Sequence, residues 1–318
     1  MATKTGSKPK VLVSNDDGIE APGIRALIAE IVKSACFDVY VSAPAGERSA
    51  QSHAITLGRY LSCAPAQVPG VLEAFAVDGT PADSVMLGMH SSLMSCNGSF
   101  DLVVSGINRG DNCGLHVIYS GTVGAAREAA CKGVPAIAFS LDNHQARKEE
   151  DFEISAQISV ALMRAALGLL PGQDPAVSPA EAFKQGGFLN VNIPNLHGRQ
   201  LQGLHVTHMS QACVFPSFKE VKEAGGPVLA EIEEHTPPSR VFRHYAGIMQ
   251  SDEAPGGDGW AMRNGWVSVT ALGLRQDLGR GQAALETAAV EAMLAATSAI
   301  VAAAAADKGL AAGGVSKL

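Results

Sequence analysis

The organisation of this chain is decided by the stretch Val11-Leu12-Val13-Ser14-Asn15-Asp16-Asp17-Gly18. Its apolar half stops at a cluster of turn-forming residues, which is typical of a buried strand that enters a loop. Apolar residues then recur at helical spacing from Ile24 to Ile31, and residues 38–42 form a second apolar strand pattern. The chain is therefore predicted to begin with a β-α-β unit.

The same alternation repeats further along the chain. Residues 75–77 and 102–104 are apolar runs that stop at Gly-containing turns and lead into helices, the second at about residues 123–132. Residues 136–140 close the series with another strand. Strands that alternate with helix-length segments predict an α/β fold with a parallel sheet, right-handed crossovers and helices on both faces. A ligand is then expected at the carboxyl ends of the strands.

The pattern changes beyond residue 150. Residues 154–170 predict a long amphipathic helix, and residues 188–193, 204–208 and 266–270 predict strands. The intervening excursion is rich in Gly, Pro and charge, and a hairpin is predicted there from the apolar residues Val228, Leu229, Ile232, Val241 and Phe242. An alanine-rich helix is expected over residues 282–306. The predicted division is a disordered tail (1–9), a core (10–209), a hairpin and oligomerisation segment (210–265), a final strand and C-terminal helix (266–306) and a tail (307–318).

Composition excludes several classes of protein. The 24 Lys and Arg against 31 Asp and Glu give a net charge of −7, which argues against binding to a nucleic acid duplex. The six cysteines form no Cys-x-x-Cys pair, so neither a zinc site nor a disulfide framework is indicated. The polar N-terminus lacks the apolar segment of a secretory signal, and the longest apolar run, residues 299–306, is too short to span a bilayer. A cytoplasmic protein without a membrane partner is expected.

Adjacent acids follow the first predicted strand. Asp16 and Asp17 can both face one ligand only if the chain turns, and Gly18 permits such a turn. Two carboxylates at the carboxyl end of a strand suit a hard divalent cation such as Mg²⁺, Mn²⁺ or Ca²⁺. The alternative is an Asx turn with solvated acids.

A second polar segment follows the strand at residues 102–104. Ser120-Gly121-Thr122 opens a helix, where free backbone N–H groups and hydroxyls can bind a phosphate; ordinary N-capping is the alternative. Asn108, shortly after Gly106, offers a neutral oxygen to a cation, or is a turn residue. In the loop after the second strand, Ser49 and His53 could bind a metal or a substrate oxygen, although a surface loop is the simpler interpretation.

These segments occur in a fixed order after successive strands, and as an ordered set they resemble the SurE family of metal-dependent phosphatases and nucleotidases. The segments that carry the resemblance are Asn15-Asp16-Asp17-Gly18, Arg48-Ser49, Ser52-His53-Ala54-Ile55-Thr56, Gly79-Thr80-Pro81-Ala82-Asp83, Ser105-Gly106-Ile107-Asn108 and Tyr119-Ser120-Gly121-Thr122. The likeness runs from about residue 10 to 142 and returns at residues 188–194, 258–261 and 265–270.

The resemblance implies a Rossmann-like core, hydrolysis of nucleoside 5′- and 3′-monophosphates by metal-activated water, and homo-dimers or tetramers. It implies one divalent cation held by Asp16, Asp17, Ser49 and Asn108, with the two aspartates catalytic. It also implies substrate binding by Gly106, Ser120, Gly121, Thr122 and His53.

The chain departs from the common bacterial pattern at Ala50, at residues 111–113 and at His116, as in the plant and algal branch. Two alternatives remain open. One is a haloacid-dehalogenase-type phosphatase, although its two aspartates are separated by one residue. The other is a regulatory module that binds nucleotide or phosphate without turnover. The ending Ser316-Lys317-Leu318 matches a peroxisomal address, which has meaning only in a source with peroxisomes.

Overall fold

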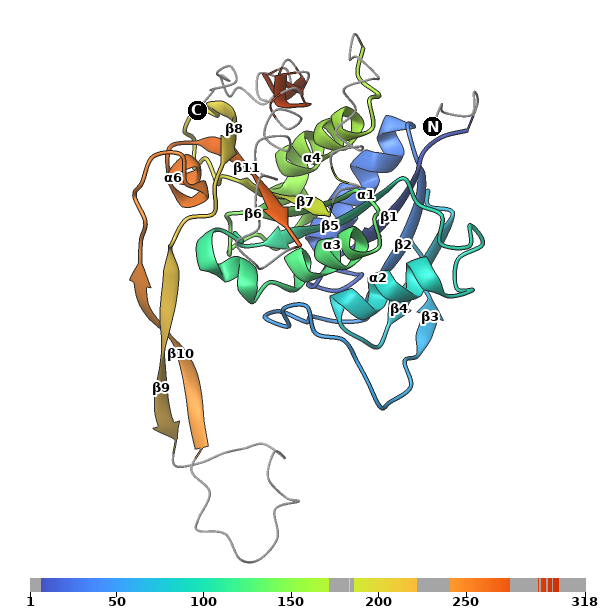
Figure 1. Cartoon of the computed structure of the whole chain (residues 1–318), viewed down its shortest axis with the longest axis horizontal. Helices are drawn as coiled ribbons and strands as arrows, with labels where there is room; N and C mark the ends of the chain where they lie inside the picture. Colours follow the sequence, from blue (N-terminus) through green and yellow to red (C-terminus); the bar gives the residue numbers. More distant parts are fainter. Residues whose placement is uncertain are drawn as a thin grey trace, which may run out of the picture.

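The computed structural model describes residues 7–171, 183, 186–221, 241–274, 291, 293–295, 297–298 and 300–302. Its centre is a nine-stranded sheet with the order β3-β4-β2-β1-β5-β6-β7-β11-β8 (Figure 1). The strands of this sheet are β1 (Lys10–Ser14), β2 (Asp38–Pro44), β3 (Cys63–Pro65), β4 (Glu73–Val77), β5 (Leu102–Arg109), β6 (Ala136–Leu141), β7 (Gly187–Ile193), β8 (Gly203–Thr207) and β11 (Trp266–Gly273).

The predicted mostly parallel α/β sheet is confirmed. β1 pairs in parallel with β2 and β5, and the parallel pairing continues to β4 on one side and to β6 and β7 on the other. Only β3, β8 and β11 run against this direction, since β3 is antiparallel to β4, β11 is antiparallel to β7, and β8 is parallel to β11. The strand order reverses between β1 and β5, which is where sheets of this kind leave a crevice for a ligand.

Helices cover both faces of the sheet. The helices are α1 (Pro22–Ser34), α2 (Pro81–His90), α3 (Gly121–Cys131), α4 (Glu153–Ala166) and α6 (Asp258–Arg263), with short 3₁₀ helices η1 (Gly114–Ile118) and η2 (Glu149–Phe152). α1 packs beside α4 on one face, and α2 packs beside α3 on the other (Figure 1).

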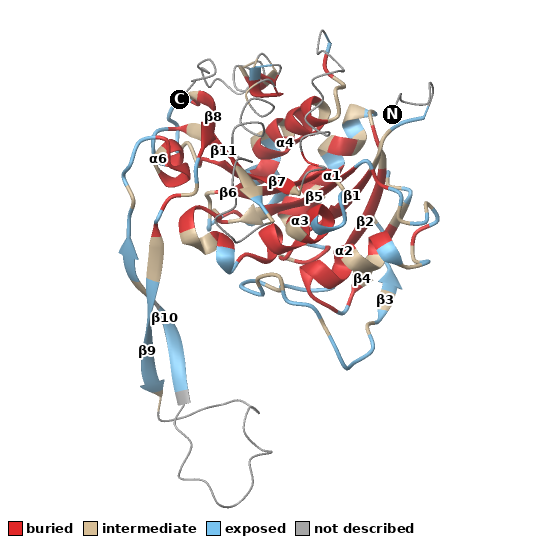
Figure 2. Cartoon of the chain, in the orientation of Figure 1, coloured by how far each residue is buried: buried red, intermediate tan, exposed pale blue. Residues whose placement is uncertain are grey.

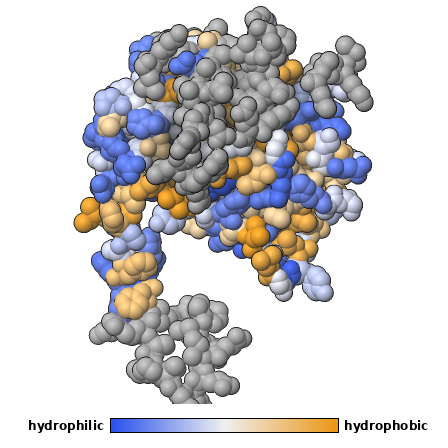
Figure 3. All heavy atoms as spheres, viewed as in Figure 1, coloured by the Kyte–Doolittle hydropathy of each residue, from blue (hydrophilic) through white to orange (hydrophobic). Residues whose placement is uncertain are grey.

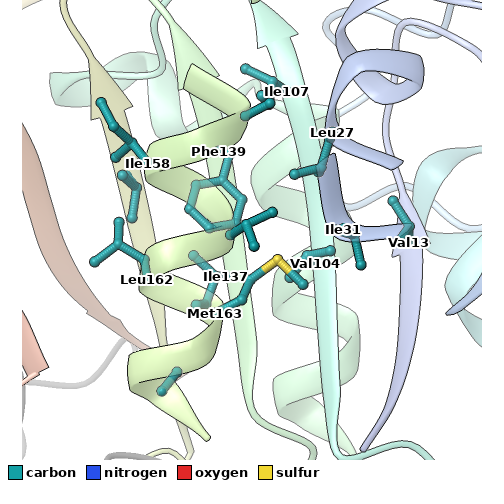
Figure 4. Close-up of a cluster of buried hydrophobic side chains, with 14 of the residues drawn as sticks. Val13, Leu27, Ile31, Val104, Ile107, Ile137, Phe139, Ile158, Leu162 and Met163 are labelled. Carbon is teal, nitrogen blue, oxygen red and sulfur yellow. The ribbon is translucent and has the colours of Figure 1, made fainter. Parts of the chain in front are cut away.

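The core divides according to the two-residue period of the strands. Val11 and Val13 of β1 belong to the apolar cluster under α1 and α4, whereas Leu12 belongs to the cluster under α2 and α3. Figure 4 shows Val13, Val104 and Phe139 from three adjacent strands in the first cluster. The central strands are buried along their length (Figure 2), so they are apolar on both faces, as expected of parallel strands between helical layers.

The last third of the chain contains a two-stranded ribbon. β9 (Cys213–Val221) pairs antiparallel with β10 (Val241–Gln250), so Val241 and Phe242 lie in a hairpin. Val228, Leu229 and Ile232, also expected in this hairpin, lie outside the described residues, and the predicted domain boundaries remain predictions. Within the helix expected over residues 282–306, the described Met293, Leu294 and Val301 are buried in the α1–α4 cluster. Within the described ranges, no helix is both long and apolar enough to cross a membrane.

Candidate active site

β1 ends in a tight turn that carries the two predicted carboxylates. Asn15 makes this turn, because its Nδ2 donates to the Gly18 carbonyl at 2.8 Å and the Gly18 N–H donates to Asn15 Oδ1 at 3.2 Å. Gly18 has φ 102°, and a Cβ there would lie 3.0 Å from the carbonyl carbon of Gly46. The Asx turn is therefore present, but it uses Asn15 and leaves both aspartates for other contacts.

Asp16 lies against the start of α3. Its carboxylate is 4% exposed and accepts hydrogen bonds from the Thr122 hydroxyl and from the Thr122 N–H. A Cβ at Gly121 would lie 2.9 Å from the Asp16 Cβ, so glycine is needed for this close approach. Asp16 thus occupies the N-terminus of α3, where the helix dipole favours a negative charge.

The other neighbouring loops also contact the acidic pair. The backbone N–H of Arg109, at the end of β5, donates to Asp17 Oδ2 at 3.0 Å. In the loop after β2, the Arg48 N–H donates to the Asp16 carbonyl at 2.6 Å. The predicted site segments after β1, after β2, at the end of β5 and at the start of α3 therefore meet at the carboxyl ends of β1 and β5.

Burial makes it unfavourable for Asp16 and Asp17 both to carry an unpaired negative charge. Burial, with a smaller contribution from the charge of Asp17, raises the pKa of Asp16 to about 7, although the hydrogen bonds from Thr122 act in the opposite direction. Burial also raises the pKa of Asp17, opposed by the N–H and the charge of Arg109. A divalent cation beside these oxygens would stabilise their ionised forms, so the donor set fits a hard cation.

Ser49 and Asn108 are the neutral donors in the predicted ligand set. Ser49 Oγ is exposed and donates to Glu47 Oε1 at 3.0 Å, while Asn108 Nδ2 donates to the Gly110 carbonyl at 2.7 Å. Among the residues that the structure describes, no group of three His, Cys, Asp or Glu side chains is arranged so that it could hold a metal ion by itself. A cation at Asp16 and Asp17 would therefore need neutral oxygens or water to complete its coordination, as Mg²⁺ commonly does.

The predicted phosphate loop also caps its helix. Ser120 Oγ accepts from the Val123 N–H at 3.1 Å, and this cap starts α3 at Gly121, two residues earlier than predicted. Gly106 has a backbone role, because it has φ 131° and a Cβ there would lie 2.3 Å from the Phe139 carbonyl oxygen. β5 can approach β6 at this point only without a side chain.

His53 has a partner within the protein. Its Nε2 lies 2.7 Å from Glu128 Oε2 on α3, and the Lys132 Nζ lies 3.6 Å from the other oxygen of Glu128. The structure thus joins the loop after β2 to α3, and it leaves the predicted contact between His53 and substrate untested. His116, which the sequence singled out, is half-buried in η1.

Sequence reasoning assigned no site role to the residues that support η1. Asp258, at the start of α6, is fully buried and accepts from the Gly114 N–H at 2.8 Å and from the Ser210 N–H at 3.1 Å. Asn192 on β7 accepts from the Asn112 N–H at 2.7 Å, and Asn190 donates to the Asn112 carbonyl at 2.8 Å. The signal was two asparagines spaced two apart in an apolar strand, which places both side chains on one face.

Comparisons with known proteins agree with this geometry. A family model described as "Survival protein SurE" matches residues 11–215. A protein of Thermus thermophilus named "5'-nucleotidase SurE 1" is 40% identical over 269 residues, covering 83% of this chain and 92% of the relative. A Geobacter metallireducens protein named "5'-nucleotidase SurE" is 37% identical over 266 residues, covering 83% and 91%.

A solved structure extends the likeness to three dimensions. The crystal structure of the SurE protein from Aquifex aeolicus matches with a TM-score of 0.62 at 32% identity, covering 89% of this chain and 100% of that one. The matched family region contains the acidic turn, the loop after β2, the end of β5 and the start of α3, which are the segments that meet at the carboxyl ends of β1 and β5. On these grounds the chain belongs to the SurE family.

Proposed function

We propose that this protein is a divalent-metal-dependent phosphomonoester hydrolase that acts on nucleoside 5′-monophosphates and also on 3′-monophosphates. The observation that carries this proposal is the contact between the Asp16 carboxylate and Thr122 at the N-terminus of α3. It puts a cation-binding carboxylate and an anion-binding helix terminus in one place, as hydrolysis of a phosphate ester requires. The relatives named 5′-nucleotidase support the same activity.

The residues assigned to the cation are Asp16, Asp17, Ser49 and Asn108, and Mg²⁺ or Mn²⁺ is the proposed ion, with Ca²⁺ as another candidate. Such an ion supplies a water of lowered pKa and neutralises charge on a phosphoryl oxygen. Thr122 holds the Asp16 carboxylate in one orientation, and the Arg109 N–H does the same for Asp17. Asp16 and Asp17 are the candidates to accept the proton of the attacking water.

The phosphate is assigned to the start of α3. The Ser120 hydroxyl accepts from Val123 and keeps its own hydrogen for donation, while the Gly121 N–H belongs to the first turn, whose N–H groups lack partners within the helix. These donors can hold a phosphoryl oxygen without displacing Thr122 from Asp16. They also place positive partial charge where negative charge spreads in the transition state.

The alternatives are not favoured. A haloacid-dehalogenase-type phosphatase needs its aspartates two residues apart, whereas Asp16 and Asp17 are adjacent. A binding module that recognises only phosphate has no need of the buried Asp16 and half-buried Asp17 carboxylates beside the phosphate loop, because they repel the ligand unless a cation is present.

The proposal is tested by phosphate release from AMP with and without Mn²⁺ or Mg²⁺. Asp16→Asn and Asp17→Asn each remove one charge and keep the size, so both variants should fold, bind Mn²⁺ more weakly by calorimetry and lose most of their activity. Asp101→Asn is the control, because this carboxylate binds the Lys10 N–H at the opposite end of β1. Full activity of either site variant in the presence of a chelator would refute the metal-dependent mechanism.

We also propose that β9 and β10 are where copies of this chain assemble into a dimer or tetramer. The ribbon extends away from the body (Figures 1 and 2) and exposes the large apolar side chains Phe215, Phe218, Phe242, Ile248 and Met249. Figure 3 shows hydrophobic side chains among hydrophilic ones along its described part. An apolar ribbon of this kind is typical of a contact surface.

The cytoplasm remains the proposed location. The Ser316-Lys317-Leu318 ending lies outside the described residues.

A further inference from the structure

Two large apolar side chains lie exposed directly before the proposed phosphate loop. Tyr119 is 59% exposed and Ile118 is 53% exposed, whereas Val117 before them and Ser120 after them are buried at 4% and 6%. Isolated exposed apolar side chains are common on proteins, so exposure alone assigns no role. Their place in the chain, directly before the Ser120 N-cap of α3, is what suggests a role for this pair.

The backbone that carries this pair is held on the loop after β2. The Ser52 N–H donates to the Tyr119 carbonyl at 2.9 Å, and Ser52 Oγ donates to the Ile118 carbonyl at 2.6 Å. The Tyr119 N–H donates to the His116 carbonyl at 3.0 Å. A Cβ at Gly124 would lie 2.2 Å from the Ser52 carbonyl oxygen, so this loop and α3 are in close contact. The exposed side chains therefore project from a fixed backbone, which lowers the entropy lost when a ligand packs on them.

The position of Tyr119 matches the shape of the proposed substrate. In a nucleoside monophosphate only the ribose separates the phosphate from the base, and Tyr119 is the residue adjacent to Ser120, to which the phosphate is assigned. An aromatic ring at this distance along the chain can stack on the base, and stacking tolerates every base because each has a π face. We propose that Tyr119, flanked by Ile118, is the stacking platform for the nucleobase, an inference that rests on the proposed function.

The platform is tested by comparing a substrate that has a base with one that lacks it. Tyr119→Ala should raise the KM for AMP by about tenfold, because the stacking contact is lost. The kcat/KM for ribose 5-phosphate should stay within about twofold of wild type, because this ester has no base to stack. Tyr119→Phe should behave as wild type on both esters. Tyr60→Ala is the matched control, since Tyr60 is a fully exposed aromatic residue in the loop that follows Ser52.

Calorimetric binding of AMP and ribose 5-phosphate separates this inference from the proposed function. If the wild-type protein hydrolyses neither ester, the proposed function fails, while a selective loss of AMP affinity in Tyr119→Ala would still support the platform. Equal losses for both esters would overturn the platform in favour of a structural role. A loss in Tyr119→Phe as large as in Tyr119→Ala, or a smaller assembly of Tyr119→Ala in light scattering, would also overturn it.

Discussion

Asp16 is a charged residue that the fold buries with neutral donors. An ionised carboxylate in an apolar setting is unfavourable unless it is hydrogen-bonded or paired, and Thr122 supplies the hydrogen bonds. A cation bound at the proposed site would stabilise the ionised carboxylate. At the scale of the residue, the proposed chemistry therefore depends on a hydroxyl that is itself completely buried.

Thr122→Val tests that hydroxyl, because valine keeps the branched shape and removes the donor. The buried Asp16 oxygen then lacks its partner, which should lower the free energy of unfolding by about 1–3 kcal/mol in chemical denaturation. Phosphate release from AMP should fall roughly 10- to 100-fold, because the carboxylate is no longer held in place. Thr122→Ser keeps the donor and serves as the control. Wild-type activity in Thr122→Val, with only stability reduced, would show that the hydroxyl has no part in hydrolysis.

His205 on β8 presents a different residue-scale case. It is 4% exposed, its ring lies 5.6 Å from the rings of Trp260 and Trp266, and its Nδ1 has no partner among the described residues. Burial lowers the pKa of His205 below its usual value. The unfolded chain therefore binds a proton before the folded one does, so protonation costs stability as the pH falls below about 6.5.

His205→Gln should remove part of this acid sensitivity. The difference in melting temperature between about pH 8 and about pH 5 should be smaller in the variant than in wild type. The exposed His208 provides the matched control, and His208→Gln should retain the wild-type difference. If His205→Gln and wild type lost the same stability at low pH, His205 would not be the cause of the acid sensitivity.

At the scale of the element, α6 holds η1 in place. Asp258 connects the beginning of α6 to Gly114, the first residue of η1, and η1 leads directly to Ser120. The Leu115 N–H donates to the Ala212 carbonyl at 2.9 Å, so the base of the β9–β10 ribbon contacts the same element. The ribbon and the proposed phosphate loop are thus joined through η1.

Asp258→Asn should disturb this connection with little change in volume. The NH2 group of asparagine replaces one of the two carboxylate oxygens, each of which accepts a backbone N–H. The lost hydrogen bond should lower the free energy of unfolding by about 1.5–3 kcal/mol. We also expect a higher KM for AMP, measured at a temperature where the variant is fully folded. Asp252→Asn is the control, because this half-buried carboxylate accepts from the Gln211 and Ala254 N–H groups in the same segment. An unchanged KM would limit Asp258 to a role in stability.

At the scale of the whole molecule, the β9–β10 ribbon exposes large apolar side chains, whereas the core of the body buries side chains of this kind. Ile248 is 80% exposed and Phe218 is 61% exposed. Replacing either by Asp should leave the melting of the isolated subunit nearly unchanged, since little is buried there, and should produce a smaller species in light scattering. Leu57→Asp is the matched control, at 82% exposure in the loop between β2 and β3. An unchanged particle mass in both ribbon variants would exclude this surface as the contact.

The sequence alone determined the alternation of strands and helices, because the spacing of apolar residues and the positions of turn residues are local properties of the chain. Residues 11–18 predicted β1 and its acidic turn, and the helix after Thr80 began at Pro81 with the capping box of Thr80 and Asp83. Asp16, Asp17, Ser49, Asn108 and residues 120–122 could be listed as candidates for the same reason: polar residues that follow buried strands are visible in one dimension.

Only the tertiary structure decided which of those polar groups contact one another. That Asn15 makes the turn, that Thr122 donates to Asp16 and that His53 pairs with Glu128 depends on how loops from separate strands meet at one edge of the sheet. Asp258 is 144 residues from its partner Gly114, so no local pattern could connect them. Burial and long-range hydrogen bonds arise only when the sheet assembles, and they determine the pKa of Asp16 and the position of the proposed phosphate loop.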